Sequence, residues 1–138
     1  MKLLTRNTDY AIRALCHIVK CKKKIVSVTD LVKTLKIPRP FLRKILQKLN
    51  KEGLLTSYKG MGGGFTLARP AGKILVTDLM KIFQGPIKLN DHIFKKGICP
   101  HIRTCALKLR LDVIEKSVIS KLEAITIASL VKDVCKGL

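Results

Sequence analysis

Four side chains with helical spacing could hydrogen-bond to the bases of nucleic acid. They are Arg39, Arg43, Lys44 and Gln47. Arginine pairs bidentately with guanine, and glutamine with adenine, in the major groove. A recognition helix must also bury an apolar stripe opposite its donors. The stretch from Pro40, which suits a first helical turn, to Glu52 meets both conditions. Its apolar stripe consists of Leu42, Ile45, Leu46 and Leu49.

A glycine-rich loop follows this stretch and suits contact with the phosphate backbone. It reads KGMGGG and lies between strand candidates at 54–58 and 65–68. Glycines let a backbone approach a phosphate or enter the minor groove, and a lysine adds a cation at the tip. The residues concerned are Lys59, Gly60, Gly62 and Gly63. The loop lacks the GxxxxGK[ST] pattern of a nucleotide-binding loop, so it predicts a β-hairpin wing.

Each of these features also has a purely structural interpretation. A basic helix face is usually only a solvated face, and a glycine-rich connection is common in hairpin turns. The order of the elements favours DNA binding, because two helices and a tight turn precede the basic helix and a hairpin follows it. This is the order of a winged helix-turn-helix domain.

Hydrophobic periodicity predicts the helices that position the basic helix. The first spans about residues 5–20. The second begins near Ser27, because Ser27 and Asp30 stand three residues apart, as in a capping box with Asp in place of Glu. A fourth helix is expected over 78–84 with Thr77 as its cap.

The charge of the chain points to an anionic partner. Its 138 residues carry 28 Lys and Arg against 9 Asp and Glu, a formal net charge of +19. Residues 1–70 hold 16 of the basic and 3 of the acidic side chains, so +13 lies in the half with the donors. Duplex DNA is the first candidate partner, and an anionic membrane surface is the second.

Catalysis and membrane insertion fit the composition poorly. The sequence has no Ser–His–Asp spacing, no HExxH motif and only three histidines. No apolar run reaches the roughly 18 residues of a membrane span, and the first ten residues lack the apolar region of a signal peptide. We therefore expect a cytoplasmic protein that is not an enzyme and does not enter membranes, with its five cysteines reduced.

Residues 37–70 read IPRPFLRKILQKLNKEGLLTSYKGMGGGFTLARP. This stretch closely resembles the Rrf-type (Rrf-two) family of bacterial transcriptional regulators. The opening TRNTDYAIRAL and the segment VTDLMKIFQG match as well, so the resemblance covers most of the chain. It implies a homodimer, most often a repressor, on a pseudo-palindromic operator. The recognition helix would enter the major groove of double-stranded DNA and the wing the minor groove.

By position, the resemblance assigns base or phosphate contacts to Arg39, Phe41 and Arg43, and the wing tip to Lys59 and Gly60. Several relatives have Arg in place of Lys59 and an acid in place of Arg43, so their operators cannot be copied. The expected DNA-binding set is Arg39, Pro40, Phe41, Arg43, Lys44, Gln47, Lys59, Gly60, Gly62 and Gly63.

Two cysteines in the segment CPHIRTC raise the question of a metal or redox role. Taken alone, Cys99 and Cys105 fit buried packing, and their spacing is wider than that of structural zinc pairs. The resemblance adds an iron–sulfur cluster, because both match the last two of three cysteines in cluster-binding members. The first cysteine is missing near His92, and Asp9 matches an acid that supplies an oxygen ligand in some members.

The resemblance therefore leaves two kinds of signal open. One is an iron–sulfur, redox or nitric-oxide signal read through a cluster whose candidate metal ligands are Cys99, Cys105, Asp9 and His92, since thiolates suit iron. The other is a metabolite or partner protein sensed by a metal-free regulator of the same fold. No roles are assigned to Cys16, Cys21 or Cys135.

A long helix is predicted from Ala106 to about Ile125, and its apolar stripe either packs on its own domain or pairs with a second copy. The stripe is Leu107, Leu111, Ile114, Val118 and Leu122. Two half-sites on a duplex favour a two-fold dimer.

We expect a mainly α chain, a winged helix-turn-helix with a β-hairpin wing and a long C-terminal dimerisation helix. Its parts are a DNA-binding domain (1–85), a sensor loop (86–105) and a dimerisation helix with tail (106–138).

Overall fold

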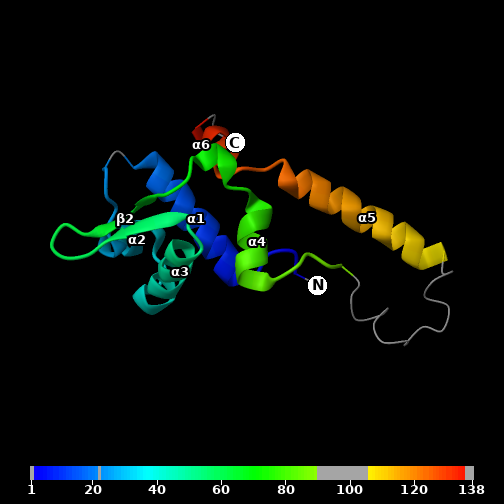
Figure 1. The fold of residues 1–138 in the computed structure, drawn as a ribbon, viewed down its shortest axis with the longest axis horizontal. Helices are drawn as coiled ribbons and strands as arrows, with labels where there is room; N and C mark the ends of the chain where they lie inside the picture. The colour runs from blue at the N-terminus through cyan, green and yellow to red at the C-terminus, as the bar shows by residue number, and fades with distance from the viewer. Residues whose placement is uncertain (1, 22, 90–105, 136–138) are drawn as a thin grey trace.

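The computed structural model describes residues 2–21, 23–89 and 106–135. These residues are mainly helical, as predicted, with one small antiparallel sheet (Figure 1). In chain order the elements are α1 (Arg6–Lys20), α2 (Val28–Leu35), α3 (Arg39–Lys51), β1 (Leu55–Tyr58), β2 (Gly64–Leu67), the 3-10 helix η1 (Ala71–Lys73), α4 (Val76–Gln84), α5 (Ala106–Glu123) and α6 (Ile127–Cys135).

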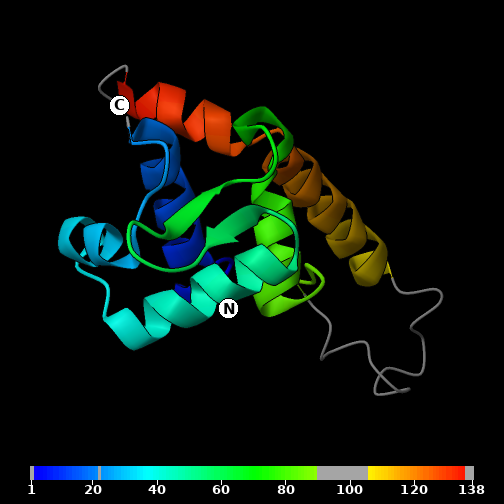
Figure 2. The same cartoon turned by 60° about the vertical axis from the view of Figure 1, so that its left-hand side comes forward.

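Helix α1 lies at the centre of the body, and α3, α4 and α6 all pack against it (Figure 2). Its buried face includes Ala11, Ala14 and Leu15, none of which has any exposed surface. Short alanine side chains let neighbouring helices approach closely. One apolar core therefore joins elements from both halves of the chain.

The predicted starts of the first two helices are confirmed. The Thr5 hydroxyl accepts a hydrogen bond from the N–H of Thr8 at 3.4 Å, and the Ser27 hydroxyl accepts one from the N–H of Asp30 at 3.1 Å. Side-chain oxygens of this kind satisfy N–H groups that have no partner within the helix. A hydrogen bond from Lys23 to the Asp30 carboxylate lowers the pKa of Asp30.

The predicted cap of the fourth helix is wrong. Helix α4 begins at Val76, and Thr77 lies inside it, buried, with its hydroxyl unpaired among the described residues. The cap comes from within the first turn, where the Asp78 carboxylate accepts the N–H of Leu75 at 3.0 Å. The helix starts early because an isolated antiparallel bridge between Leu75 and Thr126 fixes its entry, a long-range contact that local sequence cannot reveal.

The hairpin is anchored to the segment that leads into α2. Strands β1 and β2 pair from Leu55 opposite Leu67 to Tyr58 opposite Gly64. Val26 then bonds to Phe65 in both directions, with N···O distances of 3.0 and 2.8 Å. The base of the wing is thus held by a third piece of extended chain.

Helix α5 projects from the body, whereas α6 returns to it (Figure 1). Backbone hydrogen bonds of 3.0 Å from Val76 to Ile125 and from Ile127 to Ile74 fasten the junction between the two helices. Ile127 is fully buried, and α6 packs on α1 and η1. The region 106–138 therefore contains one helix that leaves the body and one that completes its core. Within the described ranges, no helix is long and apolar enough to cross a bilayer.

We expect Ile127→Ala to lower the free energy of unfolding by about 2–5 kcal/mol, because it opens a cavity where α6 meets the core. Denaturant titration followed by circular dichroism measures this loss. Val134→Ala is the matched control on α6, since Val134 is 54% exposed. Equal stability of the two variants would show that α6 contributes nothing to the core.

Candidate nucleic-acid interface

Helix α3 has one apolar and one cationic side. Leu42, Ile45, Leu46 and Leu49 are buried, as the periodicity predicted. Their side chains face the body, where α3 packs against α1, α2 and β1. The same rotation of 100° per residue turns the donors outward. The helix cannot rotate to hide its cations without exposing its leucines.

The predicted donors of α3 lie on its exposed side. Arg43, Lys44 and Gln47 are all exposed, and none of them forms an ion pair within the described ranges. Arg39 differs, because its Nη2 donates a hydrogen bond to the hydroxyl of Thr29 at 3.1 Å. This bond ties the start of α3 to α2, so Arg39 joins the two helices of the helix-turn-helix.

The wing carries its predicted residues at its tip. Gly60 and Gly62 have φ angles of +93° and +74°, a region that residues with a Cβ rarely adopt. Gly63 has a different requirement, because a Cβ there would lie 2.3 Å from the carbonyl oxygen of Tyr58. Lys59 is exposed at the same tip. Glycine is therefore required at each of these three positions.

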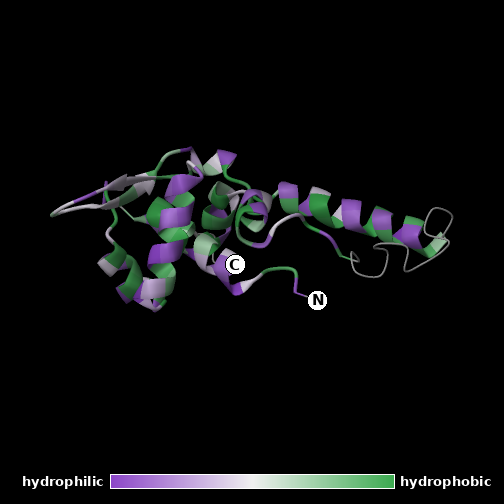
Figure 3. Ribbon diagram, turned by 60° about the horizontal axis from the view of Figure 1, so that its bottom comes forward, coloured by the Kyte–Doolittle hydropathy of each residue, from purple (hydrophilic) through white to green (hydrophobic). Residues whose placement is uncertain are grey.

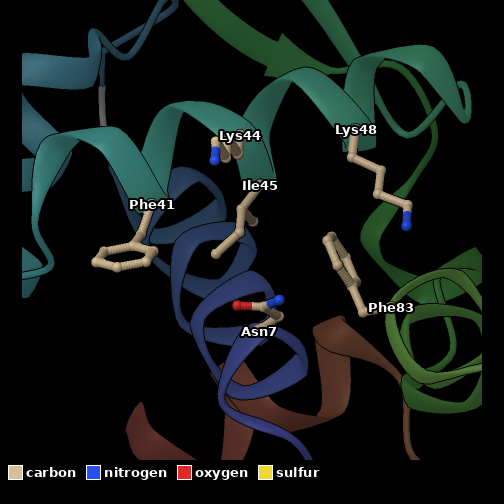
Figure 4. A pocket seen from close by; sticks show the side chains of 6 residues that line it. All are labelled: Asn7, Phe41, Lys44, Ile45, Lys48 and Phe83. Carbon is tan, nitrogen blue, oxygen red and sulfur yellow. The ribbon is translucent and has the colours of Figure 1, made fainter.

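A small cavity of about 270 Å³ lies on the flank of α3, where α3 meets α1 and α4 (Figure 4). Phe41, Lys44 and Lys48 line it from α3, with the edge of Ile45. Its other lining residues are Asn7 of α1 and Phe83 of α4. The Lys48 ammonium stands over the Phe83 ring, 5.3 Å from its centroid.

Phe41 and Lys44 belong to the expected DNA-binding set, but their neighbours in this cavity do not. Lys48 follows Lys44 by one helical turn, and this spacing could have added Lys48 to the expected DNA-binding set. No local pattern connects Asn7 or Phe83 to α3, since they come from helices far away in the sequence. Only the packing of α1 and α4 brings them together.

Gln84, the last residue of α4, fastens the start of α1. Its Oε1 accepts hydrogen bonds from the N–H of Thr5 at 3.1 Å and from the hydroxyl of Thr8 at 2.8 Å. Its Nε2 donates to the carbonyl of Leu3 at 2.9 Å. The first turn of α1, which carries Asn7, is thus fixed by the residue that precedes the predicted sensor loop.

Of the four candidate metal ligands, the structure describes one. Cys99, Cys105 and His92 lie outside the described residues. Asp9 lies in the first turn of α1, where its half-exposed carboxylate accepts from the Nε of Arg13 at 3.0 Å. An exposed carboxylate can serve as an oxygen donor. Among the residues with described positions, no three His, Cys, Asp or Glu side chains form a metal-binding group.

Hydrophobic and hydrophilic residues alternate along the ribbon of α5 (Figure 3). Of the predicted set, Leu107 and Ile114 are more than half exposed. The other predicted residues, Leu111, Val118 and Leu122, are partly covered by the chain itself. Leu109 and Val113 are also more than half exposed, so the uncovered apolar surface extends beyond the predicted stripe.

The arrangement of α2, α3 and the hairpin is that of a winged helix-turn-helix protein. The Rrf2 family, described as "Iron-dependent Transcriptional regulator", matches residues 4–133. The chain therefore belongs to the Rrf2 family, and its members are DNA-binding transcriptional regulators, a class that is not enzymatic.

Two relatives in sequence agree with this membership. Protein aau3 of Rhizobium meliloti (strain 1021) is 30% identical over 131 residues, which cover 94% of this chain and 84% of that protein. A protein of Aquifex aeolicus (strain VF5), provisionally named an HTH-type transcriptional regulator, is 39% identical over 79 residues. That match spans 57% of this chain and 55% of the Aquifex protein.

Solved structures share the fold. CymR, the global cysteine regulator of B. subtilis, superposes with a TM-score of 0.72 at 20% identity, covering 96% of this chain and 98% of that one. IscR of T. potens superposes with a TM-score of 0.70 at 25% identity, covering 97% and 88%. The predicted resemblance and the predicted fold class are confirmed.

We expect Gly63→Val to weaken binding to duplex DNA at least tenfold, because the new Cβ would collide with the carbonyl of Tyr58 and distort the wing. A mobility-shift titration measures the loss, and circular dichroism checks that the helices persist. Gly72→Val is the matched control, since a Cβ at Gly72 meets no atom within 4 Å. Unchanged affinity in a folded Gly63→Val variant would remove the wing from the interface.

Proposed function

We propose that the protein is a homodimeric repressor in the bacterial cytoplasm that binds a pseudo-palindromic operator through α3 and the wing. The observation that carries this proposal is the outward side of α3, where Arg43, Lys44 and Gln47 are exposed. No carboxylate within the described ranges neutralises them. A helix with such donors fits the major groove, which is about 12 Å wide.

Each donor has a distinct expected role. Arg43 and Gln47 are one turn apart on the exposed side of α3, and their side chains can pair with base edges, so they are the candidates for base contacts. Lys44 stands beside them and is a candidate for a phosphate contact, because a flexible ammonium carries little base specificity. Lys59 at the wing tip is a candidate for the minor groove, where narrow A·T-rich segments attract cations.

We expect Arg43→Ala to weaken operator binding by about 1–3 kcal/mol and to relax the preference at one base position. The operator is first obtained by selection from genomic fragments. Affinities are then measured for the selected duplex and for duplexes that vary each position. An equal loss on all sequences would move Arg43 to the phosphate contacts instead.

The dimer proposal rests on α5. Its exposed apolar residues, Leu107, Leu109, Val113 and Ile114, face outward from a helix that projects from the body. A two-fold pairing of such helices would cover this surface and would present two copies of α3 to successive half-sites.

We expect Ile114→Asp to yield monomers in sedimentation experiments, because the charge would be buried in the seam. Val134→Asp is the matched control, since Val134 has a similar exposure on α6. A dimer that persists in Ile114→Asp would place the seam elsewhere.

An iron–sulfur cluster is the first candidate for the signal. Cys99 and Cys105, with Asp9 or His92, would hold it and would supply a redox-sensitive or nitric-oxide-sensitive centre. Support comes from the iron-dependent description of the family and from the place of Asp9, next to Thr8, which bonds to Gln84. A change around Asp9 would thus act close to the turn that borders α3.

The second candidate is a metal-free sensor of a metabolite or a partner protein, as the absence of a third cysteine in CPHIRTC and the segment before it suggests.

If the first candidate is correct, we expect protein purified without oxygen to contain iron and to absorb visible light, and Cys99→Ser to lose both properties. Iron analysis and an absorption spectrum measure this. A colourless, iron-free protein that still binds its operator would favour the metal-free sensor.

A further inference from the structure

We propose that the cavity between α1, α3 and α4 receives a phosphate of the DNA backbone, with Lys44, Lys48 and Asn7 as its contacts. This inference rests on the proposed function, and it adds Asn7 and Lys48 as contacts and Phe83 as a positioning residue. It would give the interface a backbone clamp beside the base-reading side of α3.

The lining of the cavity has the chemistry of an anion site. Lys44 and Lys48 stand one helical turn apart on α3, and both line the cavity (Figure 4). Neither ammonium forms an ion pair within the ranges that the structure describes. Asn7 adds an amide that can donate hydrogen bonds. Among the residues that the structure describes, no acidic side chain lines the cavity, so the two positive charges remain available to a ligand.

Phe83 gives one of these charges a fixed position. The Lys48 ammonium lies 5.3 Å from the centroid of the Phe83 ring, within the distance at which a cation is attracted to an aromatic face. A surface lysine otherwise samples many rotamers, and ordering it opposes binding. The ring reduces this loss by holding the ammonium against its face before a ligand arrives.

The position of the cavity selects DNA as the source of the phosphate. Arg43 and Gln47 lie on the exposed side of α3, and Lys48 lies on the flank that lines the cavity together with α1 and α4. When a helix enters the major groove, its flanks face the phosphates on the groove walls. Phosphate contacts position a protein on the duplex without reading its sequence, which is the role that a lysine on this flank can perform.

The test compares the salt dependence of DNA binding in two lysine variants. Lys48→Gln should weaken binding to the selected operator and to an unrelated duplex by the same factor. It should also reduce the slope of log affinity against log salt by about one. Lys73→Gln is the matched control, because Lys73 is exposed in η1, which packs on α6 rather than α3. It should leave the slope unchanged.

A second arm locates the phosphate and excludes other sources. Neutral methylphosphonates are placed singly along the operator backbone. The wild type should lose affinity at one or two positions flanking the half-site, and Lys48→Gln should be insensitive at those positions. Operator affinity is also measured in inorganic phosphate and in chloride at equal ionic strength. Two results together would overturn the proposal and assign the cavity to a free anion. Inorganic phosphate would change the affinity only when Lys48 is present, and the slope of log affinity against log salt would not depend on Lys48.

A third arm tests the positioning role of Phe83. Phe83→Leu should lower the salt slope in the same direction as Lys48→Gln, whereas Phe83→Tyr, which keeps the aromatic face, should restore the wild-type slope. A change in melting temperature with an unchanged slope would show that Phe83 is only structural.

The failures of the two proposals differ. If the wild-type protein binds no duplex at low salt, the proposed function is overturned. A wild type that binds its operator, with Lys48→Gln and Lys73→Gln alike in slope, overturns only the phosphate clamp.

Discussion

The burial of four apolar side chains along one side of α3 fixes the orientation of the helix that carries the proposed DNA-binding donors. Leu42, Ile45, Leu46 and Leu49 are removed from water by α1, α2 and β1. Exposing even two such residues costs about 3–6 kcal/mol, so the cationic side must remain at the surface. Burial of the apolar side thus pre-organises a row of positive charges that form no ion pair in the described part of the chain. This unneutralised row is what an anionic duplex can use.

Other contacts hold the wing and the first turn of α1 in place around this helix. Val26 holds the wing through Phe65, and Gln84 holds the first turn of α1, which borders the flank of α3. Gln84 is also the last residue of α4, just before the segment predicted to sense the signal. A shift there would reach α3 through α1, which is hydrogen-bonded to Gln84 and packs against α3. The same body anchors α5 through its junction with α6. In the proposed dimer, the separation of the two copies of α3 would therefore depend on how the two α5 helices cross.

The sequence predicts the parts of this arrangement that local periodicity encodes. The apolar stripe of α3, the cap at Ser27 and the hairpin all follow from residues within a few positions of one another. The start of α4 was missed because it depends on the bridge between Leu75 and Thr126, about fifty residues apart. The cavity on α3 was missed for the same reason, since its walls come from three separate helices.

The most direct test of the central claim is the affinity of the intact protein for a selected genomic duplex and for a scrambled duplex, measured over a range of salt concentrations. If the outward side of α3 reads bases while its flank and the wing contact phosphates, both affinities should fall steeply with salt. The selected duplex should keep an advantage of at least about a thousandfold. Equal affinity for both duplexes, or no binding to either at low salt, would contradict the account.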